Sequence, residues 1–250
     1  AFDKAGYIDA FRVELLPEGA HPMDARYNIV SWVHRETRGW STGTSVNDPR
    51  TGEIVRGVVQ LGSLRDRQDK MIFEGLVGAD RAGTGGEDDP DRLAYQRLRH
   101  LSAHEIGHAL GIAHNFAAST FEDRASVMDY PAPWVIADGE RLDFSRAYTT
   151  GVGAWDRYVV DWLYGDAPGQ DPVARRAALA AEAQGKGYRF VNDTDTRPLG
   201  SLQPYAAMWD NGTDPVAEFA NVMAVRRIAL SRFGLANLPA GAPAADLRRV

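Results

Sequence analysis

The chain has 250 residues, enough for one large domain or two small ones with a buried core. Hydrophobic residues make up 44% and charged residues 25% of the sequence, which excludes a wholly disordered chain. The net charge is −6, no run of Lys or Arg stands out, and there is no cysteine. These features argue against a nucleic-acid-binding surface and exclude disulfides and thiolate metal sites.

The first hundred residues read mainly as strands. Residues 7–16, 27–34 and 53–62 are rich in β-branched and aromatic side chains, and turn-forming clusters separate them. Residues 64–77 then read as a helix. The opening AFDKAGYIDA has neither a start methionine nor a signal-peptide pattern, so we expect a processed or excised piece of a longer protein.

A central helix is predicted from about Asp91 through Leu110. Asp89 can cap its start, Pro90 suits the first helical position, and Gly111 offers a stop.

The second half of the chain reads as irregular and then helical. Residues 126–135 contain two prolines, whereas residues 152–165, 171–184 and 214–234 favour helices. No apolar run reaches the roughly 18 to 20 residues that a membrane-spanning helix needs. No linker separates independent units, so we predict a single domain over residues 1–250.

The motif HEIGHALGIAH (104–114) holds three of the six histidines. On a helix, His104 and His108 lie one turn apart on the same face, where both imidazoles can reach one metal ion. A left-handed Gly111 would turn the chain and bring His114 to the other two. This spacing predicts a zinc site with three histidine ligands and an open fourth position.

Glu105 directly follows the first of these histidines. Its carboxylate lies to one side of the two imidazoles, where it can reach a water at the open position of the zinc. A zinc-bound water has a pKa near about 7, and a neighbouring carboxylate can take its proton as a peptide carbonyl is attacked. A purely structural zinc is the alternative, although such sites usually recruit four ligands and favour cysteine.

The pattern HExxHxxGxxH, followed fourteen residues later by Met128 in SVMDY, resembles the metzincin clan of zinc endopeptidases. The resemblance implies that the three histidines bind zinc, that Glu105 is the general base and that Met128 lies in a Met-turn under the metal. Tyr130 matches a tyrosine that ligates the resting zinc and then stabilises the oxyanion in two branches of the clan; the alternative is that it only packs in the turn. Asn115 and Phe116 form an HNF sequence that, with SVMDYP, is similar to a bacterial group of large exported metzincins.

The resemblance implies an α+β fold with an α/β-like upper half. A twisted, mostly parallel sheet would be backed by the active-site helix, with a smaller helical and irregular C-terminal subdomain. The boundary would divide an N-terminal subdomain of residues 1–114 from a C-terminal subdomain of residues 115–250.

Substrate contacts are also implied by the resemblance. A strand before the helix would form the upper rim of the cleft and pair with extended substrate. We place this rim on residues 53–62, with Val58, Val59 and Gln60 as binding residues and Gly57 allowing close backbone approach; an ordinary strand is the alternative. Trp134 would line a substrate pocket or belong to the core.

Two weaker signals remain open. His100 could support the metal site from one turn below or be an ordinary hydrogen-bonded helix residue. Residues 192–200 resemble a calcium loop only superficially, because Arg197 stands where a ligand would fall and no glutamate closes the loop.

The sequence therefore predicts a secreted zinc metallopeptidase, a hydrolase acting as an endopeptidase on peptide or protein substrates. It predicts no nucleic-acid partner, no membrane span and a monomer. The extracellular or periplasmic location comes from the resemblance alone. The alternative is a catalytically lapsed metzincin fold that acts as a zinc-stabilised binding module, and the retained Glu105 argues against it.

Overall fold

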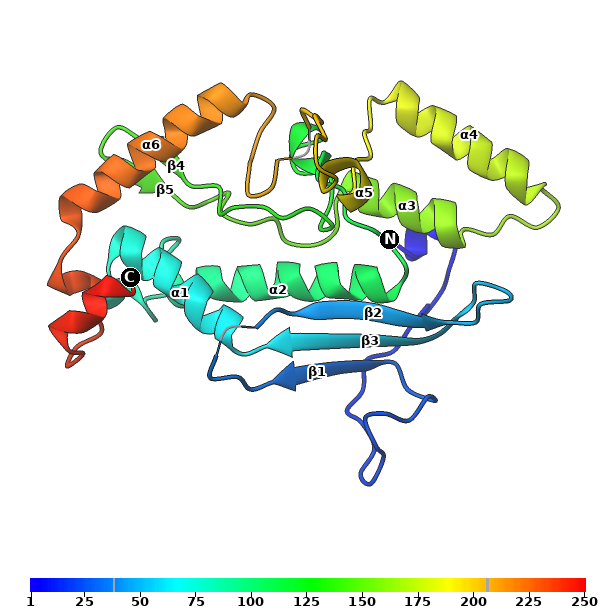
Figure 1. The fold of residues 1–250 in the computed structure, drawn as a ribbon, viewed down its shortest axis with the longest axis horizontal. Coiled ribbons are helices and arrows are strands. Elements are labelled where there is room, and N and C mark those ends of the chain that lie inside the picture. The colour runs from blue at the N-terminus through cyan, green and yellow to red at the C-terminus, as the bar shows by residue number, and fades with distance from the viewer. Residues whose placement is uncertain (38, 206) are drawn as a thin grey trace.

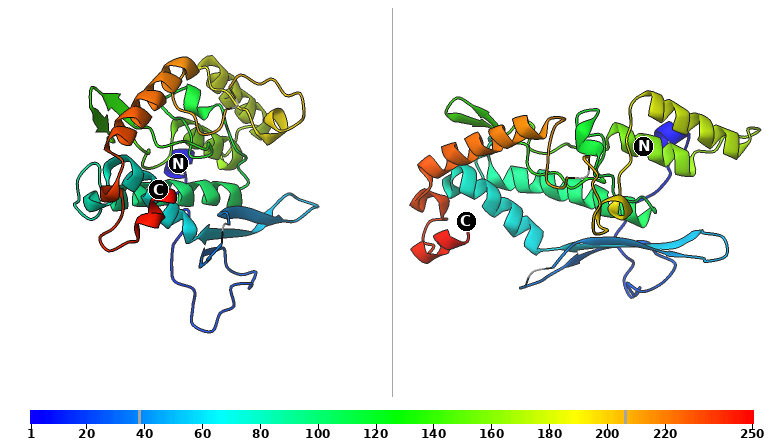
Figure 2. Two further views of the ribbon diagram at one scale, coloured as in Figure 1. Left: turned by 60° about the vertical axis from the view of Figure 1, so that its left-hand side comes forward. Right: turned by 45° about the horizontal axis from the view of Figure 1, so that its top comes forward.

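The computed structural model describes residues 1–37, 39–205 and 207–250. A small sheet forms the lower layer in Figure 1, the long helix α2 (Pro90–Ala109) crosses above it, and the helices of the C-terminal half lie on the other side of α2. Turning the molecule keeps this order of layers (Figure 2). The predicted α+β class is confirmed.

The sheet contains β1 (Ile29–Val33), β2 (Thr42–Asn47) and β3 (Ile54–Gly62) in the order β1-β3-β2. The strands expected at 27–34 and 53–62 are thus confirmed. β1 pairs with β3 in parallel, whereas β2 pairs with β3 antiparallel. Only one of the two pairings is parallel, so the sheet is mixed. β2 escaped the sequence analysis because its Thr-Gly-Thr-Ser run has no apolar alternation.

The prediction of a strand at residues 7–16 is wrong. After a short 3-10 helix, η1 (Asp3–Ala5), this segment runs without regular structure, and its contacts to the rest of the chain are made near its start, where the Tyr7 hydroxyl donates to Tyr164 C=O and Phe11 lies against Phe2. Val13 and Leu15 are 89% and 95% exposed. The alternating apolar pattern is that of a strand, but the described residues offer it no partner strand.

The two helices of the N-terminal half begin and end close to the predicted positions. α1 covers Leu64–Val77, and α2 is capped by Asp89, whose side chain accepts from Asp91 N–H with Pro90 at the first position. Leu101 of α2 packs on Val59 and Leu61 of β3. At Gly43 of β2 a Cβ atom would collide with the backbone of Glu105, so glycine allows helix and strand to touch.

The C-terminal half contains three helices close to the predicted positions, α3 (Ala154–Tyr164), α4 (Pro172–Gly185) and α6 (Pro215–Arg232), and a β-hairpin that the sequence analysis missed. The core joins the halves where Phe73 of α1 and Leu93 of α2 pack against Phe144 and Tyr148. Among the described residues, no helix combines the length and apolar character needed to cross a bilayer. The division at residues 114 and 115 stays a prediction. The remaining elements are η2 (Ala79–Arg81), η3 (Ala118–Thr120), β4 (Ile136–Asp138), β5 (Arg141–Asp143), α5 (Asp193–Thr196), η4 (Leu235–Asn237) and η5 (Ala244–Arg248).

Candidate metal centre

The structure brings His104, His108 and His114 together at the end of α2. Nε2 of His108 lies 3.1 Å from Nε2 of His104 and 3.1 Å from Nε2 of His114. Among the described residues, these three side chains form the group of potential ligands that could hold a metal ion. In the described part of the chain no carboxylate joins this group, so a four-coordinate metal held by it would have one position for solvent or substrate.

The turn after α2 explains how the third histidine reaches the first two. Gly111 has φ +80°, the left-handed conformation expected from the sequence, and its N–H donates to His108 C=O. Ile112 N–H then donates to Gly107 C=O and closes the end of the helix. The chain reverses within three residues and returns His114 to the cluster.

Each imidazole is fixed through its other nitrogen. Nδ1 of His104 lies 2.6 Å from Val127 C=O, Nδ1 of His108 lies 2.8 Å from Ile112 C=O, and Nδ1 of His114 lies 2.6 Å from a carboxylate oxygen of Asp193. Carbonyl oxygens only accept, so in the first two contacts Nδ1 carries the proton. Neutral rings therefore direct their Nε2 lone pairs at one another, an arrangement that a central cation stabilises.

The electrostatics and dimensions of the cluster also fit zinc. Burial, followed by the neighbouring His108, lowers the pKa of His104 to about 3, and burial lowers the pKa of His108. Both rings are thus neutral at physiological pH, as metal ligands must be. Tetrahedral zinc with Zn–N bonds of about 2.0–2.1 Å separates its nitrogens by about 3.3–3.4 Å, close to the 3.1 Å found here.

Glu105 is buried between α2 and the sheet. Its carboxylate accepts the N–H of Gly43 on β2, and its pKa is raised to about 7 by burial, against the opposing effects of Arg97 and of that hydrogen bond. A group with this pKa can both take up and release a proton near neutral pH.

A hydrogen-bonded turn supports the cluster. Met128 is fully buried, and its sulfur occupies the space that a side chain at Gly107 would need. The carboxylate of Asp156 accepts from Val127 N–H (3.0 Å) and from the Ser126 hydroxyl (2.6 Å). Because Val127 C=O in turn accepts from His104, α3 positions this ligand through the turn.

Tyr130 lies directly against the cluster. Its ring centroid is 5.3 Å from that of His104 and 4.6 Å from that of His114. Trp209 stacks on its other face at 5.4 Å, and Trp209 N–H donates to Tyr130 C=O. Trp209 was missed by the sequence analysis, because nothing in its local sequence links it to a turn 79 residues away.

The substrate rim expected on residues 53–62 is wrong. That strand, β3, lies in the centre of the sheet with β1 and β2 hydrogen-bonded to its two edges, so its backbone cannot pair with a peptide. Val59 is buried, and Val58 and Gln60 pair with residues of both neighbours. Gly57 faces Ala109 of α2, so its missing side chain admits the helix. The edge strand beside α2 is β2.

Trp134 and His100 have structural partners. Trp134 donates through Nε1 to Glu218 of α6 (3.1 Å), and the guanidinium of Arg146 lies 4.1 Å from its ring centroid. No contact places it at the histidines, so its assignment to a substrate pocket stays a prediction. His100 is buried and bonds to Arg97 Nη1 at 3.0 Å, which fits the hydrogen-bonded alternative.

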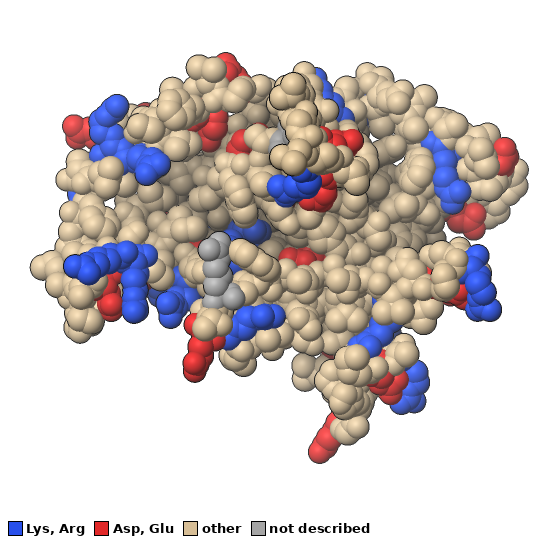
Figure 3. Space-filling view, in the orientation of Figure 1, with Lys and Arg blue, Asp and Glu red and all other residues tan. Residues whose placement is uncertain are grey.

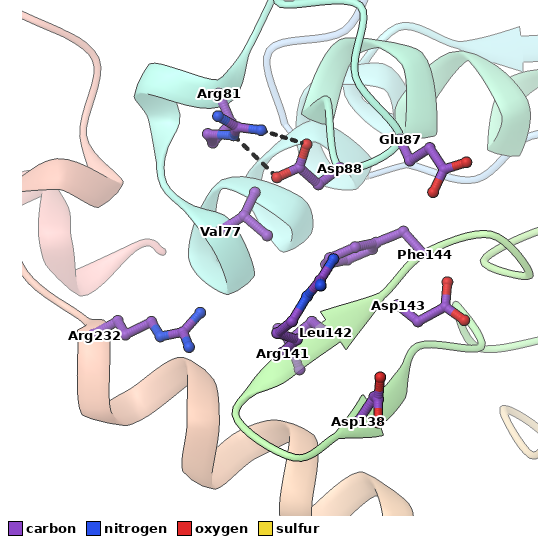
Figure 4. A pocket seen from close by; sticks show the side chains of 10 residues that line it. All are labelled: Val77, Arg81, Glu87, Asp88, Asp138, Arg141, Leu142, Asp143, Phe144 and Arg232. Carbon is purple, nitrogen blue, oxygen red and sulfur yellow. Dashed lines mark hydrogen bonds and ion pairs between the residues drawn. The ribbon is translucent and has the colours of Figure 1, made fainter.

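Two cavities are not lined by the three histidines. A cavity of about 660 Å³ lies between α1, the β4–β5 hairpin and α6, and at its rim Arg81 is bonded to Asp88 (Figure 4). An apolar groove of about 410 Å³ lies behind α2 and includes Phe11 and Ile106. Charged side chains are scattered over the face shown in Figure 3 rather than gathered into one basic patch.

A family model described as Met-zincin matches residues 86–250, which is 165 of the 250 residues. The chain belongs to the Met-zincin family. The predicted metzincin resemblance is thereby confirmed, and the match includes all three histidines. No curated protein and no solved structure gives a significant match.

Membership of the Met-zincin family indicates which metal the three-histidine cluster binds. The family and the geometry together support zinc as the cofactor, and they assign the chain to a zinc metallopeptidase fold. The sheet strands β1 to β3 lie before the matched residues.

Proposed function

We propose that this Met-zincin is a zinc-dependent endopeptidase. The observation that carries the proposal is the convergence of three Nε2 atoms, each on a ring held through Nδ1, with the carboxylate of Glu105 on the next residue of the same helix. When bound, zinc would polarise the peptide carbonyl and lower the pKa of a water at the fourth position.

Glu105 would act as the general base and then as the general acid. It would accept a proton from the attacking water and return it to the leaving nitrogen of the peptide bond. Burial supports this role because a carboxyl with a pKa raised to about 7 can hold the proton between the two steps. The Gly43 N–H fixes the carboxylate against the sheet.

Tyr130 would stabilise the negative charge that develops on the carbonyl oxygen. Its phenol is a hydrogen-bond donor, and its ring already contacts those of His104 and His114. Burial raises its pKa above the usual value, which keeps the donor proton in place at neutral pH. The turn around Met128 would be the Met-turn of the family.

An extended peptide substrate would pair with the free edge of β2. This strand is the sheet edge next to α2, and its Gly43 reaches the carboxylate of Glu105. Pairing with β2 would pass the peptide backbone close to the metal centre by β-augmentation. The proposed rim is therefore β2 in place of the central strand.

Cleavage of a peptide library tests this function. We expect the zinc-loaded protein to cut internal bonds, chelation to abolish cleavage, and Glu105→Ala to reduce it by about 10²- to 10⁴-fold with zinc still bound. Glu182→Ala, at an exposed position on α4, is the matched control and should cleave normally. Cleavage that survives chelation or the Glu105 substitution would contradict the mechanism.

A zinc-loaded protein that cleaves no peptide would instead support the zinc-stabilised binding module.

We also propose that the enzyme is a monomer acting in the periplasm or outside the cell. Fractionation of expressing cells and sedimentation of the purified chain test these two points.

A further inference from the structure

The third histidine is held differently from the other two. His104 and His108 donate to backbone carbonyls of residues 127 and 112, which no side-chain substitution removes. His114 instead donates to the carboxylate of Asp193, which lies 79 residues further along the chain. The metal site therefore depends at one point on a distant, replaceable side chain.

Asn115 explains how this distant carboxylate arrives at His114. Its side chain is fully buried, and it donates to Arg189 C=O (2.8 Å) and accepts from Val191 N–H (3.1 Å). Phe116 N–H also donates to Val191 C=O (2.8 Å). These three bonds clamp residues 189–191 onto the segment after the third histidine, and Asp193 follows two residues later.

Arg197 and Phe116 complete the arrangement. Arg197, just after the one-turn helix α5, donates through Nε to the second oxygen of Asp193 (3.1 Å). Its guanidinium lies 5.3 Å from the ring centroid of Phe116, and Phe116 stacks on His114 at 5.1 Å. His114 is therefore held in its plane by a carboxylate and on one face by an aromatic ring.

We propose that Asp193 is a positioning residue for the zinc ligand His114. Arg197 holds the carboxylate of Asp193, and Asn115 holds the segment that leads to it. The carboxylate orients the ring and makes its Nε2 a stronger donor, since a carboxylate is a better acceptor than a carbonyl. The segment at 192–200, which only superficially resembles a calcium loop, has this role in the metal centre. The proposal rests on the zinc centre of the proposed function and does not depend on peptide hydrolysis.

Zinc affinity measured against a chromophoric chelator tests the proposal. We expect Asp193→Ala to weaken zinc binding by about 10- to 100-fold. Asp193→Asn should weaken it less, because the amide oxygen can still accept from His114. The visible spectrum of the cobalt-substituted protein should also change in Asp193→Ala, as the angle of one ligand is released.

Asp195→Asn is the matched control. It removes the same charge from the same turn of helix, where Asp195 accepts from Asn192 N–H and not from a histidine, and it should leave zinc affinity within about twofold. Arg197→Gln keeps Asp193 but removes its support, and we expect a smaller loss in the same direction. A cooperative thermal unfolding transition of each metal-free variant is the check that the variant is folded.

The outcomes separate this proposal from the peptidase function. Wild-type zinc affinity in both Asp193→Ala and Arg197→Gln would overturn the positioning role while the peptidase function stands. Tight zinc binding by the wild type without any cleavage, and weak binding by Asp193→Ala, would support the positioning role and contradict the endopeptidase. Equal losses in Asp195→Asn and Asp193→Asn would also overturn it, because charge alone would then explain the effect.

Discussion

The turn around Met128 and the segment 7–16 are both irregular stretches with marked sequence patterns, yet they differ in burial and in the number of bonds that hold them. In the turn, residues from Ser126 to Tyr130 are buried or half-buried, and their backbone groups bond to partners from four other parts of the chain. In the segment, Ile8 and Leu15 are at least 90% exposed.

The difference shows what fixes an irregular segment in this protein. Asp156, Asn115 and His104 each supply a hydrogen bond to the turn, so its shape is specified by groups that would otherwise be buried without partners. Segment 7–16 has apolar side chains in alternation, and its polar contact to the body is that of Tyr7, whose hydroxyl donates to Tyr164 C=O at the start of the segment. Apolar pattern alone does not order a strand that lacks a neighbour.

The largest effect is expected from a substitution at the end of the turn, where Tyr130 is proposed to stabilise the oxyanion. Tyr130→Phe keeps the ring that contacts His104 but removes the donor to the oxyanion, so we expect kcat to fall by about 10²- to 10³-fold. Zinc content, measured by elemental analysis, should not change. Tyr95→Phe, at an exposed position of α2, is the control. An unchanged kcat would restrict Tyr130 to packing.

A second substitution removes the buried carboxylate that holds the turn. Asp156→Ala leaves the Val127 and Gly153 N–H groups without their buried acceptor, and we expect the free energy of unfolding to fall by about 3 kcal/mol. Asp171→Ala removes an exposed helix cap and should cost about 1 kcal/mol. Denaturant unfolding compares the two. Equal losses would mean that Asp156 is no more than a cap for α3.

A pH series of melting temperatures tests the buried turn through Asp129. Burial, with Asp210 nearby, raises the pKa of Asp129 to about 8, against about 3.9 in an unfolded chain. The folded state therefore holds this proton more tightly, and stability falls as pH rises from about 4 to about 8. Between pH 6 and 9 the melting temperature of the metal-free protein should fall more than that of Asp129→Asn. Parallel curves would contradict this assignment; Asp166→Asn should follow the wild type.

The smallest effect is expected in the exposed segment. Leu15→Ser should change the free energy of unfolding by less than about 0.5 kcal/mol, because Leu15 is 95% exposed. Val59→Ser, at a position 2% exposed, should cost about 2 kcal/mol or more. If Leu15→Ser proved as destabilising as Val59→Ser, the part of the segment around Leu15 would have to pack against the body in solution.

The sequence predicted those parts of the site that are close together along the chain. Helical spacing relates His104 to His108, and a left-handed Gly111 brings in His114, so local geometry sufficed. Edge positions in the sheet depend on strand order, which periodicity does not encode, and β3 was therefore mistaken for the rim. The contact of Asp193 with His114 spans 79 residues and was equally hidden.

The bonds made by Asn115 have a consequence for how the chain tolerates a break. The exposed tip between α3 and α4, residues 166–171, lies in a stretch of chain whose two ends are joined by Asn115, directly after His114. A protease that nicks this tip should leave two pieces that remain together under native conditions and separate only on denaturation. The same tip is where a foreign peptide or a second domain could be inserted with least disturbance to the zinc.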